Sequence, residues 1–95
     1  MIIRSISHKG LRRLVEDGKS SGVPARATVK IEAIVAFLTF AEDAKTIRRL
    51  HSWKAHQLTG DRKGVWSISV TRNWRITFEV NADNEIENLN FEDYH

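Results

Sequence analysis

The chain has 95 residues, with 15 Lys and Arg against 12 Asp and Glu, and a formal net charge of +3. This length predicts a single domain spanning residues 1–95. The chain contains no cysteine, which excludes disulfides and thiolate metal sites. It also lacks a run of about 18 apolar residues and a signal-peptide pattern, so we expect a cytoplasmic protein that does not enter a membrane.

The positive charge lies in the N-terminal half. Residues 1–50 hold ten Lys or Arg and five Asp or Glu, a net +5, whereas residues 51–95 hold five bases and seven acids, a net −2. A basic half suits a polyanionic partner. The need of a small protein for surface charge explains it equally well.

Apolar side chains in the first 20 residues are regularly spaced. Residues 2–6 interleave isoleucines with polar side chains and predict a short first strand. Leu11, Leu14 and Val15 fall at i, i+3 and i+4, which predicts a helix that ends at Gly18.

A longer amphipathic helix is predicted for residues 25–44. Pro24 stands just ahead of it, where a missing N–H leaves no hydrogen bond unmade. Phe37 and Phe40 are expected to widen its apolar face. One more turn is predicted for residues 47–50. The apolar positions of the long helix follow helical spacing, at Ile31, Ile34, Val35, Leu38 and Ala41.

The apolar period changes from 3.6 to 2 after Trp53. A glycine-containing turn is predicted for residues 59–64, and the pair Arg72-Asn73 is predicted to link two strands of a hairpin. The predicted strands are residues 56–58, 66–70, 74–80 and 86–91. The resulting order, β-α-α-β-β-β-β, predicts an α+β domain in which two helices pack on one face of a mostly antiparallel sheet.

Strand parity assigns polar side chains to the open face of this sheet. The apolar positions of the strand at 74–80 point to the helices, so Arg75 points to the open face. Tyr94 has the same orientation if the last strand stays extended, and His95 lies at the edge of that face. His56 begins its strand, where its side chain can lean outward. Two tryptophans have core parity, Trp66 and Trp74.

The run LTGDRKGVWSISVTRNWRITFEV, with the closing EDYH, resembles the HigB toxins of the RelE-like superfamily. The resemblance rests on three ordered pieces, at Leu58 to Ile68, Trp74 to Ile76 and Asp93 to His95, and the early HKGLRRL also fits. It implies a RelE-like fold and a ribosome-dependent endoribonuclease that cuts mRNA in the A site without a cofactor. It also implies a HigA-like helix-turn-helix antitoxin, through which alone the toxin would meet operator DNA. The functional positions implied for this chain are Arg75, Tyr94, His95 and His56.

These residue types suit RNA cleavage, because the 2′-hydroxyl is a built-in nucleophile. A histidine can remove or deliver a proton near neutral pH, and Arg75 can hold the charge of the phosphorane. Tyr94 would orient the phosphate or the 2′-hydroxyl. The order of His56 and His95 as base and acid stays open, although negative charge from Asp93 and the terminal carboxylate should favour His95 as the acid.

The chain departs from the family pattern at two places. Thr59 stands where a lysine is frequent, and Trp53-Lys54 replaces a Pro-Gly pair. Either a basic contact to the scissile phosphate is lost, or Arg62 or Lys63 supplies it. Four scattered histidines and unpaired acids predict no metal site. Four further arginines are candidates for ribosomal RNA contacts, or else a solvated face: Arg12, Arg13, Arg48 and Arg49.

Two other functions remain open from the sequence. A ParE-like toxin that poisons gyrase shares the fold, but it needs no acid–base residues. A catalytically inactive module that only binds its antitoxin is favoured by Thr59 in place of lysine.

Overall fold

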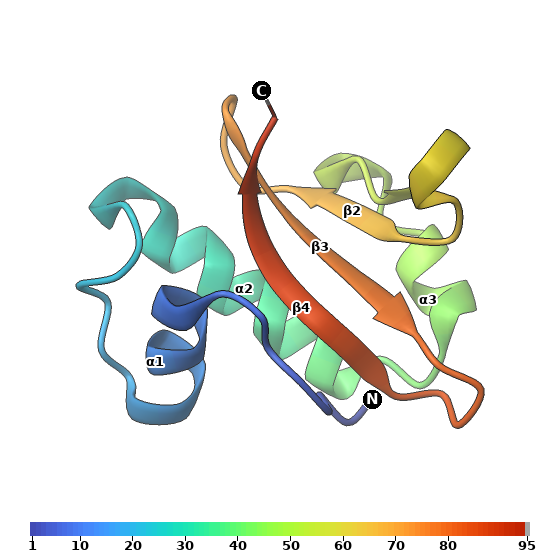
Figure 1. Cartoon of the computed structure of the whole chain (residues 1–95), viewed down its shortest axis with the longest axis horizontal. Coiled ribbons are helices and arrows are strands. Elements are labelled where there is room, and N and C mark those ends of the chain that lie inside the picture. The colour runs from blue at the N-terminus through green and yellow to red at the C-terminus, as the bar shows by residue number, and fades with distance from the viewer. Residues whose placement is uncertain (95) are drawn as a thin grey trace.

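The computed structural model describes residues 1–94, and its architecture confirms the predicted α+β class (Figure 1). Its helices are α1 (Lys9–Asp17), α2 (Thr28–Phe40) and α3 (Ala44–Arg48). Its strands are β1 (His56–Gln57), β2 (Trp66–Ser69), β3 (Trp74–Val80) and β4 (Ile86–Asp93). Three short 3₁₀ turns complete the elements, η1 (Ala25–Ala27), η2 (His51–Trp53) and η3 (Gly60–Arg62).

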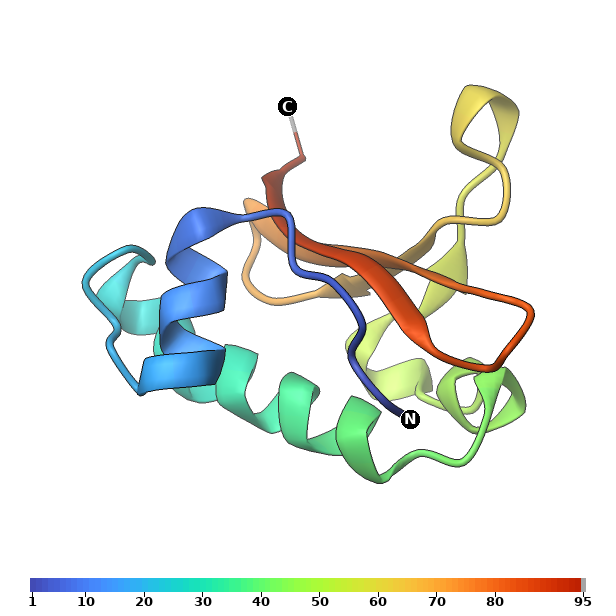
Figure 2. The ribbon, with the colours of Figure 1, turned by 60° about the horizontal axis from the view of Figure 1, so that its bottom comes forward.

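The strands form one antiparallel sheet in the order β1-β2-β3-β4, and α1 and α2 cover one face of it (Figure 2). The predicted parity explains this layering. Ile68, Ile76 and Phe78 are buried against the helices. The predicted core position is confirmed for Trp66, whereas Trp74 is half-buried and packs against the core from its edge. Trp66 stacks on Phe78 with 6.4 Å between ring centroids, and Trp74 stacks on Phe91 at 4.7 Å.

The predicted first strand is reduced to two isolated parallel bridges with β4, Ile3 to Ile86 and Ile6 to Leu89. The reason lies in β4, where Asn88 adopts a left-handed conformation (φ 54°) at an irregularity in the register. The Asn88 N–H donates to the Ser5 hydroxyl instead of a main-chain carbonyl, at 2.8 Å. A β-bulge of this kind interrupts the ladder.

The prediction of one helix over residues 25–44 was wrong at both ends. The chain enters α2 through η1, and at Ala41 the backbone becomes extended (φ −63°, ψ 140°). Asp43 then caps a separate helix, because its carboxylate accepts the N–H of Thr46 at 3.2 Å. Phe40 is 85% exposed, because at about 3.6 residues per turn it lies on the side of α2 opposite the buried Ile31, so its expected place on the core face was also wrong. No helix among residues 1–94 is long and apolar enough to span a bilayer.

Candidate active site

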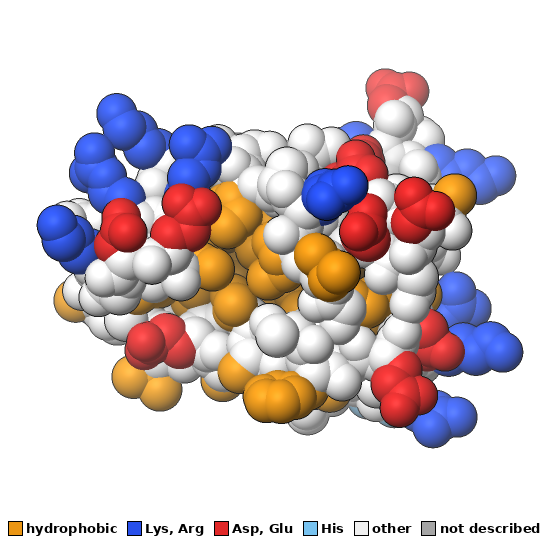
Figure 3. Space-filling view, turned by 90° about the horizontal axis from the view of Figure 1, so that it is seen from below, with side chains coloured by type: hydrophobic (Ala, Val, Ile, Leu, Met, Phe, Trp, Pro, Cys, Tyr) orange, Lys and Arg blue, Asp and Glu red, His pale blue; other side chains and the backbone are white. Residues whose placement is uncertain are grey.

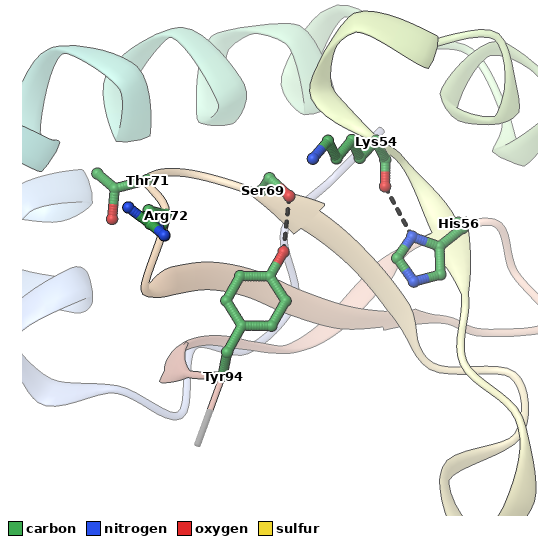
Figure 4. A pocket seen from close by; sticks show the side chains of 6 residues that line it. All are labelled: Lys54, His56, Ser69, Thr71, Arg72 and Tyr94. Atoms are coloured by element: carbon green, nitrogen blue, oxygen red, sulfur yellow. Dashed lines mark hydrogen bonds between the residues drawn. The ribbon is translucent and has the colours of Figure 1, made fainter.

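A depression of about 500 Å³ opens at the end of the sheet where β1, the β2–β3 loop and the C-terminal end of β4 meet (Figure 4). Its volume falls in the range of small-ligand sites. Of the residues that the structure describes, two cationic side chains and no Asp or Glu line it. Its lining residues are Lys54, His56, Ser69, Thr71, Arg72 and Tyr94.

Tyr94 lies across the middle of this depression. Its hydroxyl is 2.6 Å from the Ser69 hydroxyl on β2, and its backbone N–H donates to the Asn73 carbonyl at 2.9 Å. These contacts tie the end of β4 to both ends of the β2–β3 loop. The phenol therefore has a fixed place on the open side of the sheet.

Arg75 stands beside Tyr94, as the strand parity predicted. Its guanidinium carbon lies 5.1 Å from the centre of the phenol ring, within the range of a cation–π contact. The side chain is 17% exposed and forms an ion pair with Glu92 at 3.3 Å, directly opposite on β4. Its Nε is buried and has no hydrogen-bond partner among the described residues. Arg75 does not itself line the depression.

Glu92 is the centre of a polar network on the same face. Its carboxylate accepts two hydrogen bonds from Arg62, at 2.8 and 2.5 Å, and one from the Thr77 hydroxyl at 2.6 Å. The Arg62 hydrogen bond, followed by the Thr77 bond and the charges of Arg62 and Arg75, lowers the pKa of Glu92 to about 2 against the opposing effect of burial. Glu92 is therefore an anion that shares the charges of two arginines.

His56 is exposed on β1, at the other side of the depression. Its Nδ1 lies 2.7 Å from the carbonyl oxygen of Lys54. A carbonyl can only accept, so Nδ1 carries the hydrogen. In the neutral ring Nε2 then has the free lone pair. Lys54 offers this carbonyl from a left-handed conformation (φ 55°, ψ 38°).

The other predicted residues are spread over the molecule. His95 lies outside the described residues. Arg62 lines a separate depression of about 120 Å³, and Lys63 is exposed outside both depressions. Arg12 donates to the Ile6 carbonyl at 2.8 Å, and Arg48 covers the Trp66 ring at 5.7 Å.

Basic side chains gather at the end of the molecule where α1 lies, with a second group at the opposite end (Figure 3). Arg12 and Arg13 belong to the exposed side of α1, while Arg48 and Arg49 are exposed at the end of α3. Within residues 1–94 no three His, Asp or Glu side chains are grouped so that they could hold a metal ion.

Four residues of the depression were not among the predicted site residues: Lys54, Ser69, Thr71 and Arg72. Ser69 could have been found, because it pairs with Arg75 across the sheet and shares its parity. Lys54 and Arg72 lie in a turn and a loop, where side-chain direction follows no period. Sequence pattern carries no signal for them.

The fold and the sequence both match characterised proteins. A family model described as "RelE-like toxin of type II toxin-antitoxin system HigB" matches residues 4–95. The chain is 47% identical to Endoribonuclease HigB of Proteus vulgaris over 96 aligned residues, which cover 99% of this chain and all of that protein.

Three solved structures share the fold at low sequence identity. YafQ from E. coli is 14% identical with a TM-score of 0.61, over 97% of this chain and 93% of YafQ. The YoeB/ParE toxin from Agrobacterium tumefaciens is 20% identical with a TM-score of 0.56, over 97% of this chain and 99% of that one. A chain of the YoeB–YefM complex from Staphylococcus aureus is 14% identical with a TM-score of 0.55, over 100% of this chain and 99% of that one. From the family model and the 47% identical relative it follows that this chain belongs to the HigB-like toxins, the RelE-like toxins of type II toxin–antitoxin systems.

Proposed function

We propose that this toxin is a ribosome-dependent endoribonuclease that cuts translated mRNA in the A site. Endoribonuclease is also the activity named for its 47% identical relative. The observation that carries the proposal is that His56 and Tyr94 line one depression at the end of the sheet, and that the guanidinium of Arg75 lies 5.1 Å from the centre of the Tyr94 ring. A gyrase poison that acts by protein binding alone has no need of such a set.

His56 acts as the general base in this mechanism. Its Nδ1–H is held by the Lys54 carbonyl, so in the neutral ring Nε2 is the lone-pair acceptor for the proton of the 2′-hydroxyl. The deprotonated oxygen attacks the adjacent phosphorus, and the 5′-oxygen leaves with a proton. His95 supplies that proton.

Arg75 and Tyr94 stabilise the phosphorane. The guanidinium is held between the phenol ring and the Glu92 carboxylate, so its orientation is set before RNA arrives. Preorganised donors of this kind lower the barrier because they need not reorganise as charge develops. The Tyr94 hydroxyl, fixed by Ser69, donates to a phosphate oxygen or to the 2′-oxygen.

The partners follow from this role. The toxin is neutralised by a HigA-like helix-turn-helix antitoxin, and it meets operator DNA only through that protein. Translating ribosomes place its action in the cytoplasm. Two exposed pairs of arginines contact ribosomal RNA, Arg12 with Arg13 and Arg48 with Arg49, since phosphate contacts need no base sequence.

The test is to express wild type and Arg75→Ala in cells and to map mRNA 5′ ends. We expect new ends inside translated frames with the wild type, and at least about a hundredfold slower cleavage by the variant. Arg26→Ala is the matched control, because Arg26 is exposed on η1 away from the depression. Supercoiling defects without new ends would indicate a gyrase toxin instead, and an absence of toxicity an inactive module.

A further inference from the structure

We propose that Lys54 and Arg72 hold backbone phosphates of the RNA on opposite sides of the depression, and so supply the basic contact that Thr59 cannot make. This inference rests on the proposed function and concerns how the same site binds its substrate. It assigns a binding role to two residues outside the set Arg75, Tyr94, His95 and His56.

The first step concerns which cations are free to bind an anion. Arg62 and Arg75 both share the Glu92 carboxylate. Lys54 and Arg72 are exposed, and neither forms an ion pair with a carboxylate among residues 1–94. No Asp or Glu of residues 1–94 lines the depression, so no side-chain carboxylate in that part of the chain cancels the field of these two cations at its lining. Within the part of the chain that the structure describes, they are the cations of this depression that form no ion pair.

The second step excludes the replacements that the sequence suggested. Arg62 is committed to Glu92 through both terminal nitrogens and lines the other depression. Lys63 lines neither depression. Thr59 is exposed at the start of η3, with no charge to offer. The basic contact to the substrate therefore comes from the residues that do line the depression.

The third step concerns Lys54. Its left-handed backbone is a conformation that a lysine adopts at a cost and a glycine adopts freely. The same turn presents the carbonyl that fixes His56. The side chain of Lys54 extends from this turn towards Ser69, while its carbonyl faces His56 (Figure 4). A phosphate held by Lys54 therefore lies on the Ser69 side of the imidazole.

The fourth step concerns Arg72. The β2–β3 loop that carries it is closed by hydrogen bonds from the N–H groups of Val70 and Thr71 to the Trp74 carbonyl, at 3.0 and 3.1 Å. The carbonyl of the next residue, Asn73, accepts the N–H of Tyr94. Arg72 thus lies beside Thr71, across Ser69 and Tyr94 from His56, while the Lys54 backbone lies beside His56 and its side chain extends towards Ser69 (Figure 4). RNA that spans the two cations passes over Tyr94.

The experiment is an NMR titration of ¹⁵N-labelled toxin with a six-nucleotide 2′-O-methyl RNA of mixed sequence. This probe cannot be cleaved, because its 2′-oxygens are blocked. The variants are Lys54→Gln, Arg72→Gln and the double variant. Lys54→Arg and Arg72→Lys keep the charge, and Lys19→Gln and Arg26→Gln are charge-matched controls at exposed positions outside the depression.

We expect each single variant to weaken binding about two- to fivefold at physiological salt, which is the scale of one exposed charge pair. The double variant should weaken binding by about the product of the two single fold-changes, because the two sites act independently. The slope of log affinity against log salt should fall by about 0.7 for each lost phosphate contact on a single strand. The charge-keeping variants should bind nearly as the wild type does.

The inference is overturned if the double variant binds as the Lys19→Gln and Arg26→Gln controls do, or if the wild type shows no salt-dependent binding of the probe. Its failure and that of the nuclease proposal are separable. If Arg75→Ala loses cleavage but the double variant binds the probe as the controls do, the nuclease proposal holds and the phosphate contacts of Lys54 and Arg72 are excluded. If binding of the probe depends on Lys54 and Arg72 but the wild type makes no mRNA cuts, the site binds RNA and the nuclease proposal fails.

Discussion

The hydrogen bond between His56 and the Lys54 carbonyl selects which nitrogen of the ring can accept a proton. Among residues 1–94 this is the only hydrogen bond of a side chain that is otherwise exposed. The proposed base is held by one short contact, so its orientation depends on the turn at Lys54 more than on surrounding packing. The residue-scale consequence is that losing the ring should affect chemistry while leaving the fold intact.

We therefore predict that His56→Ala lowers the rate of mRNA cleavage about 10²–10⁴-fold, the usual worth of a proton-transfer group. Added imidazole should restore part of the rate, because the exposed site leaves room for a free base. The measurement is cleavage of ribosome-bound mRNA with and without imidazole. His51→Ala is the control, since His51 is exposed on η2 and does not line the depression. A rate for His56→Ala equal to that of the control would remove His56 from the mechanism.

Individual positions on the regular strands could be predicted from the sequence, and positions in turns could not. Period-2 alternation placed Arg75 and the end of β4 on the same face, and the structure brings Arg75 within 5.1 Å of the Tyr94 ring. The alternation says nothing of Glu92 as a shared ion-pair partner, because that depends on the reach of Arg62 from η3. Lys54 and Arg72 were missed because they lie in a turn and a loop, where no alternation sets the side-chain direction.

At the scale of elements, the sheet hairpin could be predicted and the helix boundaries could not. The alternating runs around Arg72-Asn73 gave the β2–β3 pair because one buried face fixes its register. The apolar spacing runs on through Ala41, so the spacing alone extended the helix too far. What ends α2 is local, namely the extended backbone at Ala41 and the Asp43 cap of the following helix.

One contact between elements depends on two glycines. A Cβ atom on Gly10, inside α1, would lie 2.1 Å from the carbonyl oxygen of Gly22 in the loop before η1. Real Cβ atoms do not approach a backbone oxygen so closely, and both neighbours here are main chain. The loop therefore packs on α1 only because position 10 has no side chain.

We predict that Gly10→Ala lowers the free energy of unfolding by about 1–3 kcal/mol, the cost of forcing extra volume into a packed contact. This loss should exceed the small gain that alanine brings to a helix. Urea unfolding measures it, with Lys9→Ala as the control in the same helical turn, where the side chain is exposed. A stability of Gly10→Ala equal to the wild type would mean that the loop moves away at no cost.

At the scale of the whole molecule, the Glu92 network joins parts of the chain that are distant in sequence. It links η3 through Arg62, β3 through Arg75 and Thr77, and β4 through Glu92 itself. The face of the sheet away from the helices is thus closed over in part by polar contacts, with Thr77 only 2% exposed. The network also holds Arg75 beside Tyr94, so it connects the stability of the fold to the geometry of the site.

The depressed pKa of Glu92 predicts how stability changes with pH. A carboxyl group whose pKa falls from its ordinary 4.5 to about 2 on folding stabilises the protein above the ordinary value, and the stabilisation is lost as the pH falls from about 4.5 towards 2. At neutral pH, Glu92→Gln should therefore have a free energy of unfolding about 2 kcal/mol lower than that of the wild type, after allowance for the partly exposed Arg62. Urea unfolding measures this difference. The difference should shrink steadily below about pH 4.5. Glu32→Gln is the control, because Glu32 is exposed on α2, and its stability relative to the wild type should not change with pH in this way. If the difference for Glu92→Gln stays constant down to about pH 3, the pKa of Glu92 is not lowered in the folded protein.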